Sequence, residues 1–231
     1  NVPSATSLRA QMQVLRDPRV WRYCQYYSVV FGGYVALALW LTKYYINEFG
    51  FSIQLAAFLA ACFSLPGGVL RAIGGSDRAG AYRTTWYVLW IMWICFFFLS
   101  YPQTDLTIST VNGPMSFHIG HNPWVFTFLL FLMGIATAIG KASVFKFISD
   151  DFSHNIGAAS GVVGLAGGLG GFLLPVLFGI ALDLTGIRSS CFMLLFGTVS
   201  VSLIWMHFSR YSDVQHPREE AEGAQGKAAA Q

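Results

Sequence analysis

The chain has 231 residues, of which 55% are hydrophobic and only 11% are charged, and its formal net charge is +3. Soluble domains carry about 25% charged residues, so this composition excludes an ordinary water-soluble domain and points to lipid as the solvent. We expect neither a cofactor nor a nucleic acid among its partners.

Six stretches without Asp, Glu, Lys or Arg predict the membrane spans. They are residues 23–42, 49–70, 84–104, 106–140, 152–182 and 189–209. Each is long enough, because crossing the hydrocarbon core takes about 20 apolar residues at 1.5 Å each. Residues 86–99 are apolar throughout rather than alternating in polarity, which favours helices over the strands of a barrel. The predicted fold class is therefore an all-α membrane protein with six transmembrane helices.

The segments around the six-helix bundle, which we place at residues 23–210, have compositions of their own. Residues 1–22 are expected to form a basic cytoplasmic linker, with a break at residues 17–18 where Pro follows Asp. Residues 102–123 are rich in Thr, Ser, Asn and Gly, and predict an irregular outer loop. Residues 211–231 are polar and low in complexity, and predict a disordered cytoplasmic tail.

Lysines and arginines in the connecting segments predict the orientation. With the loops assigned alternately, ten fall on one side: Arg9, Arg16, Arg19, Arg22, Arg78, Arg83, Lys146, Arg210, Arg218 and Lys227. Lys43 and Arg188 fall on the other side. Because such residues are enriched in cytoplasmic segments, we expect both termini in the cytoplasm and the bundle in the cell's inner (plasma) membrane.

Two basic residues fall within the predicted spans. Arg71 follows the second apolar stretch, and an ionisable group inside a span is a functional candidate. Alternatively, Arg71 extends to the cytoplasmic surface, because Asp77 is only six residues away. Lys141 lies between the small residues Gly140 and Ala142, which are typical of a packed helix face, and we expect it in the interior.

Aromatic residues and glycines complete the candidate site. Tyr27 and Phe31 are one helical turn apart and could clamp a flat anion, or could only be packing. Gly157, Gly161, Gly164, Gly168 and Gly171 recur at spacings of 4, 3, 4 and 3 residues. At about 100° per residue they share an arc of roughly 80°. This bare face predicts close packing against another helix and, together with Gly167, a border to a substrate path.

A weak internal repeat relates the second and fifth predicted helices. Both pair glycines with a proline, in Pro66-Gly67-Gly68 and in Gly170-Gly171 followed by Pro175. The two copies end on opposite sides of the predicted membrane. This pattern is typical of the inverted three-plus-three repeat within one six-helix transporter half.

Three runs resemble the nitrate/nitrite porter family of the major facilitator superfamily, in its carboxyl-terminal half. They are Phe63–Gly68 followed by Arg71–Gly75, Gly140–Lys146, and the glycine-rich run Gly161–Pro175. The likeness covers about residues 16–210. One departure is the cytoplasmic loop motif at Gly75–Gly80, which is two residues shorter than in the superfamily, whereas Gly179–Gly186 keeps the full spacing.

The resemblance implies transport of nitrate or nitrite by alternating access, not catalysis. It assigns Arg71 to substrate binding, with Tyr27 covering the anion, Phe31 beside it, and Lys141 tuning the field or taking part in coupling. It also implies an amino-terminal six-helix half that is absent here, so that the chain is incomplete alone. The Gly140-Lys141-Ala142 element is similar to the branch linked to proton-coupled uptake, which makes protons a candidate coupling partner; symport and nitrate/nitrite antiport both stay open.

Two alternatives come from other functional classes. One is a half-transporter for another small anion that acts as a homodimer. The other is a membrane electron carrier, which would need histidines within the spans. Most histidines lie instead in predicted loops or in the tail, which disfavours the electron carrier.

Overall fold

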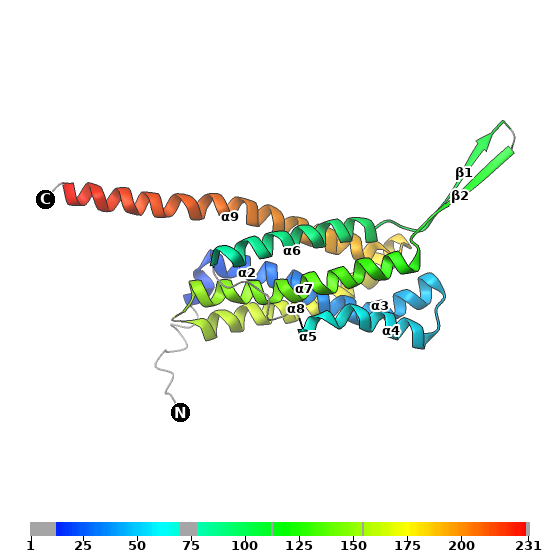
Figure 1. Ribbon diagram of the computed structural model, residues 1–231, viewed down its shortest axis with the longest axis horizontal. Helices are drawn as coiled ribbons and strands as arrows, with labels where there is room; N and C mark the ends of the chain where they lie inside the picture. Colours follow the sequence, from blue (N-terminus) through cyan, green and yellow to red (C-terminus); the bar gives the residue numbers. More distant parts are fainter. Residues whose placement is uncertain (1–12, 70–77, 112, 154, 230–231) are drawn as a thin grey trace, which may run out of the picture.

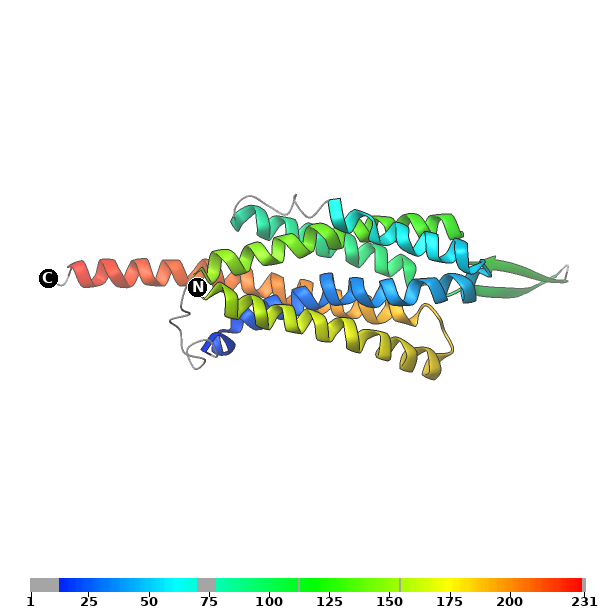
Figure 2. The ribbon, with the colours of Figure 1, turned by 90° about the horizontal axis from the view of Figure 1, so that it is seen from below.

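The computed structural model describes residues 13–69, 78–111, 113–153 and 155–229, and it is mostly helical. Long helices run side by side as a bundle, and a two-stranded sheet projects from one end of it (Figures 1 and 2). Helix α2 begins and helix α9 ends on the side opposite this sheet (Figure 1).

The first span consists of three continuous helical pieces. They are α2 (Pro18–Tyr27), the π-helix η2 (Ser28–Gly32) and α3 (Gly33–Phe49), and a 3₁₀ turn, η1 (Gln13–Arg16), precedes them. Asp17 caps the start by accepting the backbone N–H of Arg19 at 2.9 Å, and Pro18 suits the first helical position. The break therefore lies where the sequence predicts it, but the helix already includes residues 18–22 of the predicted linker.

The second predicted span is divided. Helix α4 (Ile53–Ser64) has 12 residues, about 18 Å, which is shorter than the hydrocarbon core of a bilayer. Helix α5 (Pro66–Val69) follows at once, and Pro66 has no N–H with which to continue the hydrogen bonds of α4. Residues 70–77, which would complete this span, lie outside the described part of the chain.

Four longer helices make up the rest of the bundle. They are α6 (Arg78–Leu99), α7 (Pro123–Asp151), α8 (Ile156–Thr185) and α9 (Ser190–Ala229). Together with the first span, they give five helices in the described residues that are long and apolar enough to cross a membrane. Five of the six predicted spans are thus confirmed by length and composition, and the inverted repeat stays a prediction.

Helix α9 continues beyond the membrane-length segment. Its backbone is helical through residues 211–229, where the sequence predicts a disordered tail. Four of these residues are Ala and three are Glu, which favour helices, whereas Pro217, Gly223 and Gly226 do not.

Residues 104–119 form a β-hairpin instead of the predicted irregular loop. Strand β1 (Thr104–Thr110) pairs antiparallel with β2 (Gly113–Ile119). The prediction was wrong because it followed the turn-forming composition. Leu106 and Ile108 alternate with polar residues, which is the period of a strand.

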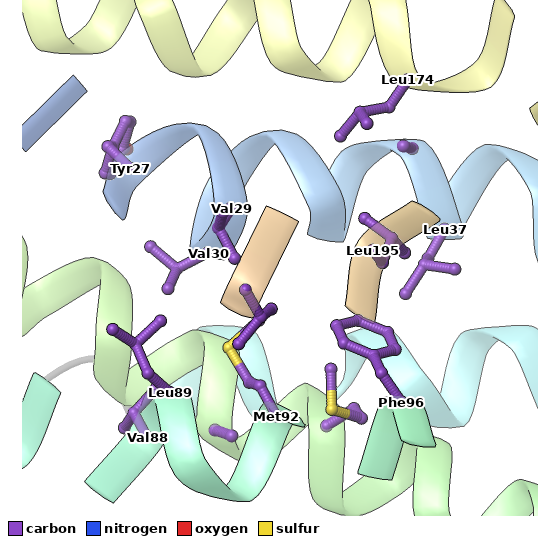
Figure 3. Packing of buried hydrophobic residues seen from close by; sticks show 14 of the residues in the cluster. Tyr27, Val29, Val30, Leu37, Val88, Leu89, Met92, Phe96, Leu174 and Leu195 are labelled. Carbon is purple, nitrogen blue, oxygen red and sulfur yellow. The ribbon is translucent and has the colours of Figure 1, made fainter. Parts of the chain in front are cut away.

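The interior is apolar and centres on the first span. Figure 3 shows Val30 and Leu37 of this span between Leu174 of α8 and Met92 of α6. At Gly140 of α7, an added Cβ would lie 2.9 Å from both Val30 and Val88. Three helices therefore meet at this glycine, with α7 close enough to hold the first span in place.

Candidate functional site

Two aromatic rings of the first span form a stack. The rings of Tyr27 and Phe31 are nearly parallel, at 7°, with centroids 5.1 Å apart. Phe145 of α7 meets the Tyr27 ring edge-on at 5.0 Å and 90°. Tyr27 is buried, whereas Phe31 is only partly buried. The predicted aromatic pair is therefore formed, and a neighbouring helix fixes its orientation.

Gly167 of α8 provides the space for this stack. A Cβ at position 167 would lie 2.5 Å from Cδ1 of Tyr27 and 3.0 Å from Cδ1 of Phe31. Real Cβ contacts are longer than this, so any side chain there would displace the rings. Glycine is required at this position for close approach and not for an unusual backbone angle.

The backbones of α8 and η2 are in contact just beyond the stack. A Cβ on Gly32 would lie 3.0 Å from the carbonyl oxygen of Gly167 and 3.0 Å from Cα of Gly170. Ser28 donates its hydroxyl to the carbonyl oxygen of Ala166 at 3.0 Å. The π-helix η2 therefore lies at the closest crossing of the first and fifth spans, and such π-turns are frequent at functional sites.

The glycines of α8 divide into two faces. Gly167, Gly170 and Gly171 contact the first span, whereas Gly157, Gly161, Gly164 and Gly168 have no described atom within 4 Å of an added Cβ. The sequence predicts close packing of another helix along the second set together with Gly171. Gly171 packs in this way against Val35. For the other four glycines, close packing stays a prediction. The face that bears these four glycines is open within the described part of the chain.

Lys141 lies in the interior, as predicted. The residue is only 5% exposed, and its Nζ lies 3.6 Å from the centroid of the Tyr34 ring. Lys146, on another side of α7, instead donates to Asp150 at 2.8 Å. The two lysines therefore occupy different environments, one buried over an aromatic ring and the other in an ion pair near the end of the helix.

The aromatic stack and the lysine belong to one arrangement of two facing helices. Tyr27, Phe31 and Tyr34 follow each other at helical spacing on the first span. On α7, Phe145 contacts Tyr27, and Lys141, one turn earlier, contacts Tyr34. Tyr34 and Phe145 were not singled out from the sequence, although their spacing from Phe31 and Lys141 could have indicated them.

Arg71, the predicted source of positive charge, lies outside the described residues, as do Gly75 and Asp77 of the shortened loop motif. The nearest described residue with a contact to the site is Gly67, four residues before Arg71 in sequence. A Cβ at Gly67 would lie 3.8 Å from Nζ of Lys141. The second span therefore reaches the site at Gly67.

Several charged groups at the ends of the bundle are paired. Arg188 donates to Glu48 at 3.0 Å, and the Tyr23 hydroxyl donates to the Asp151 carboxylate. Burial would raise the pKa of Asp17, but hydrogen bonds from the side chain and backbone of Arg19 hold it below its ordinary value. Within the described ranges, no three His, Cys, Asp or Glu side chains gather as a metal site requires.

Comparisons with known proteins agree with this architecture. The sequence profile of the Major Facilitator Superfamily matches residues 105–231. A Thermus thermophilus protein named "Probable nitrate/nitrite antiporter NarK1" is 42% identical over 203 residues, which are 86% of this chain and 45% of that protein. The "Nitrite extrusion protein" of Bacillus subtilis is 28% identical over 87% of this chain and 48% of its own length.

A third relative, "Probable nitrate transporter NarT" of Staphylococcus haemolyticus, is 30% identical over 74% of this chain and 40% of its own length. The chain thus spans about half the length of the curated relatives it matches.

Proposed function

Since the chain belongs to the Major Facilitator Superfamily, a family of transporters rather than enzymes, we propose that it is the carboxyl-terminal half of a nitrate/nitrite transporter. Its six helices would pair with an amino-terminal six-helix half. The anion would bind between the two halves near mid-membrane, and rocking of the halves would expose it to each side in turn. The names of the three relatives support nitrate or nitrite as the substrate.

The observation that carries this proposal is the Tyr27–Phe31 stack beside a buried lysine. A monovalent anion must lose water to enter the membrane interior, and a fixed positive charge there compensates much of that loss. The ammonium of Lys141 lies on the same pair of facing helices as the stack. Lys141 is buried, and exclusion of water strengthens the attraction between opposite charges.

Each predicted site residue has a role in this proposal. Arg71 supplies a planar guanidinium suited to a planar oxyanion. Tyr27 and Phe31 offer flat contact, and Lys141 tunes the field or takes part in coupling, with protons as the candidate coupling ion. Of the four predicted glycines of α8, Gly167 and Gly171 hold this helix against the first span, and Gly164 and Gly168 offer bare backbone as a wall of the path.

The open face of α8 supports the need for a second half. Gly164 and Gly168 have no described neighbour within 4 Å, and Leu165 and Phe172 of the same helix are 65% and 69% exposed. Bare backbone in a membrane protein is typical of close approach to another helix. A partner half would cover this face and close the chamber.

The orientation belongs to the same proposal. Helix α2 begins and helix α9 ends on the side of the bundle opposite the hairpin (Figure 1). The lysine and arginine bias supports a cytoplasmic location for the side opposite the hairpin. The protein would then lie in the inner (plasma) membrane, with β1 and β2 outside.

Uptake of labelled nitrate into lipid vesicles tests the proposal. Vesicles would carry this chain alone, or this chain produced together with its own amino-terminal half or that of the Thermus relative. We expect uptake only in the paired form. Nitrate uptake by the chain alone, with crosslinking that traps it as a homodimer, would contradict the pairing, and uptake of a different anion only would favour the alternative half-transporter.

A further inference from the structure

The contact between Lys141 and Tyr34 lies in the interior of the helix bundle, joins two candidate membrane spans and involves an ionisable group. The ammonium nitrogen is 3.6 Å from the ring centroid, and the lysine is 5% exposed. Ionisable groups inside spans are costly and mark substrate or ion pathways. The face of an aromatic ring is negative and attracts a cation, most strongly where water is excluded. The Tyr34 ring is therefore an internal ligand for this ammonium.

The ring is held from the second span, independently of the lysine. The Tyr34 ring packs against Phe63 with centroids 5.1 Å apart, and its hydroxyl lies 3.5 Å from the carbonyl oxygen of Ser64. A Cβ at Gly67 would lie 3.3 Å from that hydroxyl. Two helices thus fix the ring, whereas lysine has a flexible four-carbon chain. The lysine chain is therefore the more mobile member of this pair.

The position of the pair relates it to the aromatic stack. Tyr34 lies three residues after Phe31, and Lys141 lies four residues before Phe145, which contacts Tyr27. The contacts Tyr27–Phe145 and Tyr34–Lys141 are therefore successive contacts between the same two helices, with Phe31 between them. Along the helix axis, Phe31 lies about 4.5 Å from Tyr34 and Tyr27 about 10.5 Å, so an anion at the Phe31 end of the stack would lie within one helical turn of the ring that holds the ammonium.

A bound anion and the Tyr34 ring would then compete for one cation. A full negative charge attracts an ammonium more strongly than a ring quadrupole does in the same surroundings. Resting on the proposed function, we infer that Tyr34 is a positioning residue that holds the Lys141 ammonium when the site is empty and yields it to the anion. Loss of the ring contact opposes anion binding, so Tyr34 weakens affinity and favours release.

The test weakens the attraction of the ring at position 34 for a cation while its shape is kept. In the paired transporter, Tyr34→Phe would be followed by phenylalanines carrying one, two and three fluorine atoms, which withdraw electrons from the ring face. Tyr34→Leu, which removes the ring, is the coarser variant and can be omitted if it fails to fold, since the fluorinated series keeps the shape. The half-saturating nitrate concentration and the maximal uptake rate are measured for each variant.

We expect the half-saturating concentration to fall stepwise with fluorination, by about ten-fold in total, the ratio that corresponds to loss of one moderate cation–π contact. The maximal rate should fall as well, because release slows. In a Lys141→Met background the series should be flat. A purely structural role for Tyr34 would not give a graded change that depends on Lys141.

The inference is overturned if the half-saturating concentration stays constant along the series, or if it changes equally in the Lys141→Met background. Either result leaves the proposed function intact. If the paired protein moves neither nitrate nor nitrite, the proposed function fails. In that case the thermal unfolding midpoint of each variant is measured with and without chloride, nitrite and formate. A shift in the midpoint with any of these anions that grows with fluorination and requires Lys141 supports competition between the anion and the Tyr34 ring. Absence of a shift with all three anions overturns the inference.

Discussion

The substitution Gly167→Ala should disrupt the Tyr27–Phe31 stack. The new Cβ would lie 2.5 and 2.8 Å from two ring carbons of Tyr27 and 3.0 Å from Phe31. Ordinary contact begins at 3.4 Å, so the Tyr27 ring would have to move by about 1 Å. Phe145 blocks movement on another side of this ring. Overpacking of this kind costs about 1–3 kcal/mol of the free energy of unfolding.

The matched control is Gly179→Ala in the same helix, where no described atom lies within 4 Å of the added Cβ. Both substitutions gain the same helix propensity, up to about 1 kcal/mol. The difference between the two variants therefore isolates the contact with the rings. We expect Gly167→Ala to be about 1–3 kcal/mol less stable than Gly179→Ala.

Thermal unfolding in lipid nanodiscs measures the stability, and nitrate uptake by the paired form measures the site. A ring displaced by about 1 Å should raise the half-saturating nitrate concentration roughly ten-fold for Gly167→Ala, equivalent to about 1.4 kcal/mol. Gly179→Ala should stay close to the parent protein in both assays. Equal behaviour of the two variants would refute the assignment of Gly167 to the support of the stack.

Three further substitutions test the packing and the ends of the helices. Gly134→Ala should be the most damaging glycine variant in a thermal unfolding assay, because its Cβ would lie 2.1 Å from the backbone oxygen of Phe63, which cannot rotate away. Asp17→Ala should lower the free energy of unfolding by about 0.5–2 kcal/mol through loss of the helix cap. Folding lowers the pKa of Asp17, so this carboxylate stabilises the fold above its ordinary pKa of 3.8. That stabilisation is lost as the pH falls through the pKa of the folded state. A stability difference between the parent protein and Asp17→Ala that stays constant from neutral to acidic pH would contradict this. Lys146→Met should change stability by less than about 1 kcal/mol, because its ion pair with Asp150 is partly exposed, and a larger loss in urea titrations would show that the pair is structural.

The sequence was sufficient to predict the elements that depend on a long apolar stretch. Charge-free stretches predict helices such as α7 and α8 because a span must satisfy its own backbone hydrogen bonds. The break at Asp17 was predictable from capping chemistry alone. Lys141 was also predictable as interior, since small neighbours on a helix are typical of a packed face.

Features that depend on the relative rotation of helices were harder to predict. The glycine periodicity of α8 indicates a bare face correctly, but Gly167, which supports the ring stack, lies off that face. The spacing of Tyr34 from Phe31 indicates a shared helix face, but the sequence does not show that Lys141 lies over the Tyr34 ring. The hairpin was missed because turn-forming residues outweighed a short alternating pattern.

The central claim is that this chain supplies half of an anion site through Arg71, the Tyr27–Phe31 stack and Lys141. Its most direct test is to measure exchange of labelled nitrate across the membrane of vesicles that contain the paired form with Arg71→Lys. The control variant is Arg188→Lys, which changes an exposed arginine paired with Glu48. The account predicts that Arg71→Lys loses at least about ten-fold in nitrate affinity, because a lysine cannot form the bidentate contact, and that Arg188→Lys does not. Unchanged exchange in Arg71→Lys would contradict the account.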